Sequence, residues 1–269
     1  MPELPEVETT ANGIRPHVSG RFIKRIIIRE RRLRWPVSES IDHLQGHQIQ
    51  GVSRRGKYML MPVDGGTLIW HLGMSGSIRV LPIEQAIEKH EHVEIQLDHG
   101  QALRFRDPRR FGSLLFTTDD PLQHRLLCQL GPEPLSDAFH DAYLYRICRS
   151  RHASIKSVIM DSRQVVGVGN IYASEALFRA GIRPTRTAGS ISKKRLTRLV
   201  KAIKQTLQIA IDQGGTTLQD FSQVDGKPGY FAQSLLVYGV KGGCTLCGQK
   251  IRQIVQNQRS SYFCAHCQT

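Results

Sequence analysis

The chain has no long apolar run, and acidic residues are scarce in it. None of its 269 residues lies in an apolar stretch approaching the ~20 residues that a membrane-spanning helix needs. Its first residues are acidic and lack the apolar core of a secretory signal peptide, so we expect a soluble, cytoplasmic protein. Asp and Glu number 23 against 37 Lys and Arg, which gives a net charge of +14. A folded protein this basic most often binds a polyanion, with a generic basic surface as the alternative.

The six cysteines lack the pattern of a disulfide framework. Four of them form two C-x-x-C pairs, Cys244/Cys247 and Cys264/Cys267, separated by sixteen residues. This spacing is typical of a four-cysteine zinc ribbon, in which two knuckles complete a tetrahedron of thiolates. The sequence therefore predicts one structural zinc ion per chain, with no open coordination position for catalysis.

Apolar periodicity divides the chain into two kinds of structure. Between residues 22 and 116 short runs alternate with period two and are separated by Gly, Asp and Pro turns. Seven or eight such strands predict an antiparallel β-sandwich, preceded by a first helix over residues 5–14. After a linker at 130–134 the period becomes 3.6, most clearly over 192–213, which predicts helices.

The fold class predicted from this pattern is α+β multidomain. We expect an N-terminal β-sandwich domain over residues 1–130, a helical domain over 131–237 and a C-terminal zinc finger over 238–269. Residues 216–230, rich in Thr, Asp, Gly and Pro, form a long loop in the helical domain. Loops of this length inside a compact domain are usually functional or disordered.

The first six residues contain a candidate nucleophile. Removal of Met1 would leave Pro2 as a free secondary amine beside Glu3. An α-amino group titrates near pH ~8, so much of it is neutral and nucleophilic at neutral pH. Its addition to a sugar carbon gives an iminium, which stays cationic and drives elimination. The alternative, that Pro5 and nearby acidic residues merely begin a helix, stays open on these residues alone.

The Gly-x-Gly segment at Gly167–Gly169 precedes a stretch, residues 173–180, that is predicted to be helical. Glycines before a helix let backbone N–H groups converge on an anion, and Asn170 adds a side-chain donor. The segment lacks a preceding strand and the third glycine of the dinucleotide-binding fingerprint. In so basic a chain, a cradle for a DNA phosphate is the favoured interpretation.

Two loops of the β-sandwich carry residues suited to probing a duplex. Residues 72–76 place Met74 between glycines, and residues 107–112 place an Arg pair and Phe111 in a turn. An enzyme that acts on a base within a duplex must extrude it, fill the gap and hold the base left behind. A flexible Met, an aromatic wedge and an Arg fork suit these tasks. The alternative places Met74 and Phe111 in the sandwich core.

Taken in order, these motifs resemble those of bacterial formamidopyrimidine-DNA glycosylases. The matching stretches are Met1–Thr9, His71–Gly76, Asp107–Gly112, Val166–Asn170, Asp225–Tyr230 and the terminal zinc ribbon. The resemblance covers essentially the whole chain. It implies a bifunctional repair enzyme that excises oxidised purines, such as 8-oxoguanine and formamidopyrimidines, and nicks the abasic strand by β,δ-elimination. It also implies a β-sandwich joined to a helical domain with a helix–two-turn–helix motif and a zinc finger.

Catalytic roles follow from the resemblance, position by position. Pro2 matches the Schiff-base nucleophile and Glu3 its acid/base partner. Lys57 matches a lysine that touches phosphate and donates a proton in β-elimination, and Arg259 matches an arginine assigned to δ-elimination. Because an arginine is a poor proton donor at neutral pH, a phosphate contact is the better-supported role for Arg259.

The resemblance also implies contacts to damaged double-stranded DNA. The matching residues are His90, Arg109, Arg151 and Asn170. Arg109 would also face the orphaned cytosine, with Met74 filling the gap and Phe111 acting as the wedge. We expect a monomer that binds no membrane and associates with the nucleoid when acting.

Two alternatives accompany this hypothesis. An endonuclease VIII-like glycosylase for oxidised pyrimidines is disfavoured by Leu4, where that class tends to have glycine. A non-catalytic zinc-ribbon DNA-binding protein would have no need of Pro2 next to Glu3. Gln219, where some relatives have lysine, leaves the ranking of oxidised purines open.

Overall fold

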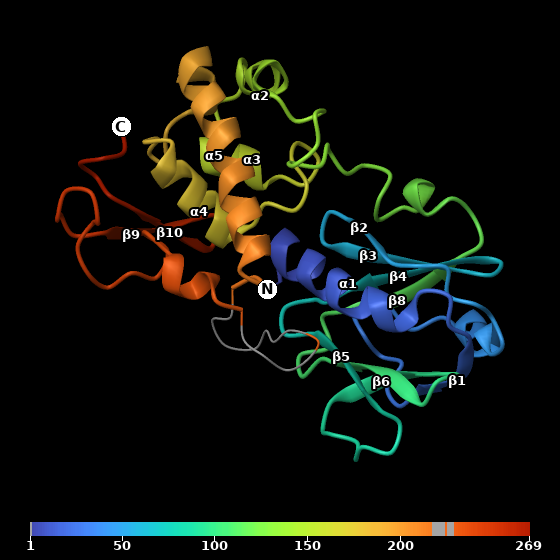
Figure 1. Ribbon diagram of the computed structural model, residues 1–269. Helices are drawn as coiled ribbons and strands as arrows, with labels where there is room; N and C mark the ends of the chain where they lie inside the picture. Colours follow the sequence, from blue (N-terminus) through green and yellow to red (C-terminus); the bar gives the residue numbers. More distant parts are fainter. Residues whose placement is uncertain (1, 217–223, 225–228) are drawn as a thin grey trace. The chain divides into compact units, whose positions relative to one another are not determined.

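The computed structural model describes residues 2–216, 224 and 229–269, which form two compact units (Figure 1). The first unit contains residues 2–128 and the described residues between 213 and 230. The second contains residues 129–212 and 231–269. The unit boundary lies between residues 128 and 129, and the helices of residues 129–212 belong to one unit with the zinc finger.

The sequence placed the 216–230 loop in the helical domain. Its described residues group with the first unit instead. The backbone N–H of Thr216 donates to Glu6 Oε1 at 2.8 Å, and Val224 lies in the core of the first unit. These long-range contacts tie the segment to α1 (Leu4–Val18).

The first unit is the predicted antiparallel sandwich. One sheet has the order β1-β6-β7-β5 and the other β2-β3-β4-β8. The strands are β1 (Ile23–Ile28), β2 (Ser53–Arg55), β3 (Tyr58–Val63), β4 (Gly66–His71), β5 (Ser77–Pro82), β6 (Glu91–Leu97), β7 (Gln101–Arg106) and β8 (Ser113–Thr117). The short 3-10 helices η1 (Glu39–Leu44) and η2 (Pro121–Gln123) complete this unit.

Side chains from both sheets form one buried core. Trp70 of β4 packs edge-on against Phe105 of β7, with ring centres 5.5 Å apart, so the two sheets meet through aromatic rings. Helix α1 contacts β2, β3 and β5 and buries Leu4, Val7 and further apolar residues. It extends four residues beyond the predicted end at Ile14, with Pro16 inside its last turn.

The second unit combines helices with a zinc-finger hairpin. Its elements are α2 (Asp141–Cys148), α3 (Ile155–Met160), α4 (Asn170–Arg179), η3 (Ala188–Ser190), α5 (Lys193–Asp212), η4 (Phe231–Ser234), β9 (Arg252–Gln256) and β10 (Arg259–Phe263). The apolar stripe predicted for α5 is buried against the other helices. Strand β10 packs against α4. In the described ranges, no helix has the length and apolar character that crossing a bilayer requires.

Candidate active site and nucleic-acid interface

Two buried carboxylates organise the start of α1, where Pro2 lies. Glu3 is the N-cap residue, and its side chain accepts a hydrogen bond from the backbone of Glu6. Glu6 Oε2 accepts from the backbone N–H of Glu3 at 2.7 Å, which completes a capping box. The two residues are only 3% and 2% exposed. Pro2 is also buried, so the chain start is held in place beside two acidic groups.

The turn that carries Lys57 is tied to the same helix. Strands β2 and β3 are joined by Gly56 and Lys57, and Gly56 has the positive φ of 59° that a tight hairpin of this kind requires. Arg54 donates from Nη1 to the carbonyl of Gly56 at 2.9 Å and from Nε to Glu8 of α1 at 2.6 Å. This ion pair fixes the hairpin that bears Lys57 to the helix that bears Pro2.

His71 lies at the end of β4, with its ring centre 4.8 Å from that of Tyr58. Its Nδ1 accepts the backbone N–H of Gly73 at 2.9 Å. Burial, followed by the charges of Lys57 and Arg34, lowers the pKa of His71 from 6.5 to about 4. The ring is therefore neutral at pH 7 with its proton on Nε2, and it can donate one hydrogen bond there.

The two loops predicted to probe DNA are joined by the buried carboxylate of Asp107. Its Oδ1 accepts from the hydroxyl of Ser75 at 2.9 Å, and its Oδ2 accepts from the backbone N–H of Gly112 at 2.7 Å. The loops approach so closely that a Cβ on Gly73, which has a φ of 66°, would lie 2.3 Å from Gly112 N. Only glycine fits there, so the two loops form one structure.

This structure presents three of the predicted residues to solvent. Met74 and Phe111 are 38% and 43% exposed, which rules out the alternative that they are core residues. The guanidinium of Arg109 lies 5.0 Å from the centre of the Phe111 ring, within range of a cation–π interaction. A large exposed Met and Phe beside an Arg are suited to binding a partner rather than to stabilising the sandwich.

His90 borders the same loops. It adopts a φ of 72°, which is uncommon for a side chain with a Cβ, and its carbonyl accepts the backbone N–H of Asp107 at 3.0 Å. Desolvation, with smaller contributions from Lys89 and Arg106, lowers the pKa of His90. His90 thus lies next to the residue that organises the Arg109 loop.

In the second unit, a polar pocket of about 200 Å³ brings together Asn170 and Arg259. Asn170 begins α4, earlier than the helical stretch at 173–180 predicted from the sequence, and its Nδ2 donates to the carbonyl of Ser260 at 2.9 Å. Arg259 follows a two-residue turn in which Asn257 and Gln258 both have positive φ. Arg151 is not among the lining residues; its Nε donates to the carbonyl of Ile147 at 2.9 Å.

Lys156 lines this pocket and had no assigned role from the sequence. It is only 3% exposed, and its ammonium donates to Ser261 Oγ at 2.7 Å and to the Ser260 carbonyl at 3.1 Å. A buried lysine bound to the zinc-finger hairpin adds positive charge to a site that already contains Asn170 and Arg259. The guanidinium of Arg259 and the charge of Lys156 suit an anion such as a phosphate.

The four predicted zinc ligands form one cluster. Their sulfur atoms lie within 4.8 Å of one another, with Cys244–Cys267 and Cys247–Cys264 separations of 3.8 and 3.5 Å. Four sulfurs at about 2.3 Å from a zinc ion in tetrahedral geometry are about 3.8 Å apart. The residues therefore fit one structural zinc ion, held entirely by protein ligands.

Three family models match the chain in order. The formamidopyrimidine-DNA glycosylase N-terminal domain matches residues 1–114, the H2TH domain of the same glycosylase matches 130–222, and the zinc finger found in FPG and IleRS matches 244–269. The chain belongs to the formamidopyrimidine-DNA glycosylase family. The predicted fold class and the structural zinc are thereby confirmed.

Relatives of this family match over their full length. Formamidopyrimidine-DNA glycosylases of Idiomarina loihiensis and Pseudomonas aeruginosa are each 55% identical, with all of both chains covered. The crystal structure of MutM (Fpg) from Thermus thermophilus is 38% identical with a TM-score of 0.90, covering 99% of this chain and 98% of that one. The Lactococcus lactis Fpg complex with DNA containing an abasic site is 33% identical, with a TM-score of 0.92 and 99% coverage of both chains.

Sequence reasoning assigned no site role to Glu6, His71, Asp107 or Lys156. Glu6 could have been found from its position three residues after Glu3, the spacing of a capping box. His71 and Asp107 lie in motifs already singled out, but their partners are distant in the chain. Nothing in the sequence around Lys156 indicates that its ammonium is buried against the zinc finger of this glycosylase.

We expect His71 to stay neutral well below its ordinary pKa. In an NMR titration of the folded protein its midpoint should lie near pH 4, because burial and two cations oppose protonation. The unfolded chain takes up this proton near pH 6.5, so the free energy of unfolding falls as the pH drops from 6.5 to 4. Allowing for the partial exposure of the ring, this loss is about 2 kcal/mol, and His71→Gln should lack it. A folded-state midpoint near 6.5 would contradict the assignment.

We expect zinc to be structural and indispensable for DNA binding. Cys247→Ser leaves an incomplete tetrahedron, and so small a finger cannot fold without its metal. Zinc content and duplex binding should both be lost, while tryptophan fluorescence stays native because Trp35 and Trp70 both lie in the first unit. Cys128→Ser, an exposed thiol of the first unit, is the control and should change neither. Full DNA binding by metal-free protein would refute the prediction.

Proposed function

We propose that this DNA glycosylase removes oxidised purines, including 8-oxoguanine and formamidopyrimidines, from duplex DNA and then cleaves the abasic strand by β,δ-elimination. The observation that carries the proposal is the buried capping box of Glu3 and Glu6, which fixes Pro2 in the same unit as the exposed Met74, Arg109 and Phe111. Lactococcus lactis Fpg, similar over 99% of its length, has been solved in complex with DNA containing an abasic site, and a point mutant of it in complex with DNA containing Fapy-dG.

The reaction begins with the neutral amine of Pro2. Its lone pair attacks C1′ of the extruded nucleotide, a C–N bond forms, and the bond from C1′ to the base breaks. The attacking amine gives up its N–H proton and the leaving base takes one up, a transfer for which Glu3, buried beside Pro2, is placed. The C1′–O4′ bond then breaks, O4′ takes up a proton, and an iminium forms between Pro2 and C1′. The nitrogen of this iminium is bonded only to carbon, namely two carbons of Pro2 and C1′. It therefore has no N–H proton to lose.

The iminium makes the elimination steps possible. It acidifies the proton on C2′, and its loss expels the phosphate on the 3′ side. Loss of a second proton, from C4′, expels the phosphate on the 5′ side. Water then adds at C1′, the C1′–N bond breaks and Pro2 is released. Lys57, held at its hairpin turn, is the candidate proton carrier in the first elimination.

Phosphate contacts are assigned to both units. Lys57 and the Nε2–H of His71 provide donors in the first unit. Asn170, Lys156 and Arg259 provide them in the pocket of the second. Arg151 and His90 are proposed as further DNA contacts. Such contacts hold the DNA without reading its sequence, and their number sets the salt dependence of binding.

Lesion recognition is assigned to two places. Arg109, stacked near Phe111, would donate to the acceptors of the base opposite the lesion, while Met74 fills the gap and Phe111 separates the neighbouring bases. Gln219, the departure noted in the sequence, lies outside the described residues. We further propose that the protein acts as a monomer on cytoplasmic, nucleoid DNA.

Pro2 should be the covalent residue. Borohydride reduction during reaction with a duplex containing 8-oxoguanine opposite cytosine should give a stable adduct, and peptide mapping should place it on Pro2. Pro2→Gly, or retention of Met1, should suppress trapping with little loss of duplex affinity, because few phosphate contacts are removed. Pro5→Ala is the matched control and should still be trapped. An adduct mapped to Lys57 would overturn the assignment.

Arg109→Ala should erode the preference for cytosine over adenine opposite the lesion. One well-placed Arg fork discriminates between bases by an amount on the order of 1–3 kcal/mol. The quantity to measure is the ratio of single-turnover excision rates on the two duplexes at fixed salt. Arg110→Ala is the matched control, since Arg110 is bound to Glu30 at 3.2 Å, and it should leave the ratio unchanged. If Arg109→Ala slows excision equally on both duplexes, Arg109 only contacts phosphate and does not read the opposite base.

A further inference from the structure

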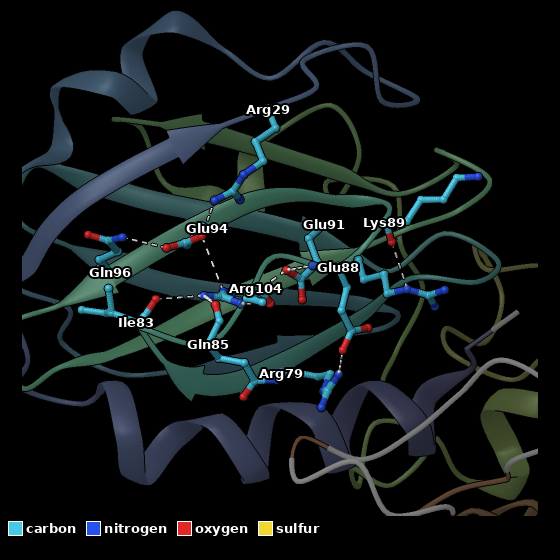
Figure 2. Close-up of polar contacts among 12 residues, drawn as sticks. Arg29, Arg79, Ile83, Gln85, Glu88, Lys89, Glu91, Glu94, Gln96 and Arg104 are labelled. Carbon is cyan, nitrogen blue, oxygen red and sulfur yellow. Dashed lines mark hydrogen bonds and ion pairs between the residues drawn. The ribbon is translucent and has the colours of Figure 1, made fainter.

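An arginine is completely buried in the sheet that leads to the Arg109 loop (Figure 2). Arg104 of β7 is 0% exposed and pairs in register with Glu94 of β6. Its guanidinium lies 3.5 Å from the carboxylates of both Glu91 and Glu94. Burial raises the pKa of Glu94, but hydrogen bonds from Gln96 and Arg29 outweigh it and hold the pKa below its usual value. Glu94 is therefore ionised at neutral pH.

Arg104 also binds the backbone of the loop between β5 and β6. Its Nη2 donates to the carbonyls of Ile83 and Gln85 at 3.1 and 2.7 Å, and its Nη1 donates to that of Ala86 at 3.1 Å. One side chain thus donates hydrogen bonds to three carbonyls of a loop that contains no strand or helix.

Neighbouring side chains bind the rest of this loop in the same manner. Arg106, two residues after Arg104 on the same face of β7, donates to the carbonyl of Lys89 at 3.3 Å. Glu91 accepts the backbone N–H of Glu88 at 3.0 Å, and Arg79 of β5 pairs with the Glu88 carboxylate at 3.0 Å. Hydrogen bonds and an ion pair therefore hold the loop against the sheet along its length, as far as Lys89, the residue before His90.

A buried ion network of this kind is a poor means of stabilising a fold. Desolvation of the charges offsets most of their attraction, and well-packed apolar residues often do as well or better. What the network provides instead is a single backbone geometry for the loop. Apolar packing has no directionality and could not specify three carbonyl positions.

The end of this loop is His90, whose carbonyl accepts the backbone N–H of Asp107. Asp107 in turn binds the backbone of Arg109 and Gly112. We propose that Arg104 is a positioning residue that sets His90 and, through Asp107, the Arg109 loop in their DNA-binding geometry. This inference rests on the proposed function for the assignment of His90 to DNA.

Arg104→Lys tests the proposal. The lysine keeps one positive charge for Glu91 and Glu94 but cannot donate to all three carbonyls. Glu94→Gln is the matched control, because it alters the network on the strand side and leaves the loop carbonyls bound. In the free protein, the His90 ring and Asp107 amide NMR resonances should shift in Arg104→Lys and stay in place in Glu94→Gln. Unshifted resonances in Arg104→Lys would overturn the positioning role, whatever the role of His90 on DNA.

A double-mutant cycle connects this geometry to function. His90→Ala should weaken duplex binding roughly fivefold in the wild type, the size of one hydrogen bond, and less than twofold in Arg104→Lys. In Glu94→Gln the full effect of His90→Ala should persist. An equal effect in all three backgrounds would overturn the proposal, whereas no effect in the wild type would refute only the DNA contact of His90. If Arg104→Lys fails to fold, Arg106→Ala, which releases the Lys89 carbonyl, replaces it in this cycle, with the same outcomes decisive.

Discussion

The buried carboxylate of Asp107 fixes the exposed loops of the first unit relative to one another. It binds the hydroxyl of Ser75 on one loop and the backbone of Arg109 and Gly112 on the other. The backbone N–H of Asp107 donates to the carbonyl of His90, and the backbone carbonyl of Asp107 accepts a hydrogen bond from the His92 ring at 2.8 Å. A buried carboxylate is costly unless its oxygens are all paired, and here the pairing is also what positions Met74, Arg109 and Phe111. Loss of this one group would release all three.

Two further buried carboxylates, those of Glu3 and Glu6, have a comparable role at the start of the chain. Glu3 and Glu6 satisfy the free N–H groups at the beginning of α1, and Glu6 also binds the backbone of Thr216, more than two hundred residues later. The same acidic residues thus complete the start of the helix that follows Pro2 and bring a distant segment to it. Substitutions at Glu6 will therefore disturb the helix start and the distant segment together.

The zinc finger is held to the helical part by polar contacts that the metal alone would not provide. Lys156 and Asn170 both donate to the carbonyl of Ser260, and the side chain of Gln268 donates to the carbonyl of Ile182 at 2.8 Å. Zinc gives the β9–β10 hairpin its shape, and these hydrogen bonds place Arg259 beside Asn170. The pocket lined by Asn170 and Arg259 therefore depends on the metal indirectly, through the position of the hairpin.

The sequence by itself determined those features that depend on local spacing. The C-x-x-C pairs predicted the zinc site, period-two runs predicted the sandwich, and the apolar stripe of 192–213 predicted α5, because each is a property of neighbouring residues. The motifs also identified the family, because each of them is a short continuous run of the chain. Tertiary structure decided which polar groups are buried together. The neutral state of His71, the burial of Lys156 and Arg104, and the grouping of Thr216 with α1 all arise from partners far away in the chain. Desolvation and pairing depend on that packing, and no local pattern of residues encodes it.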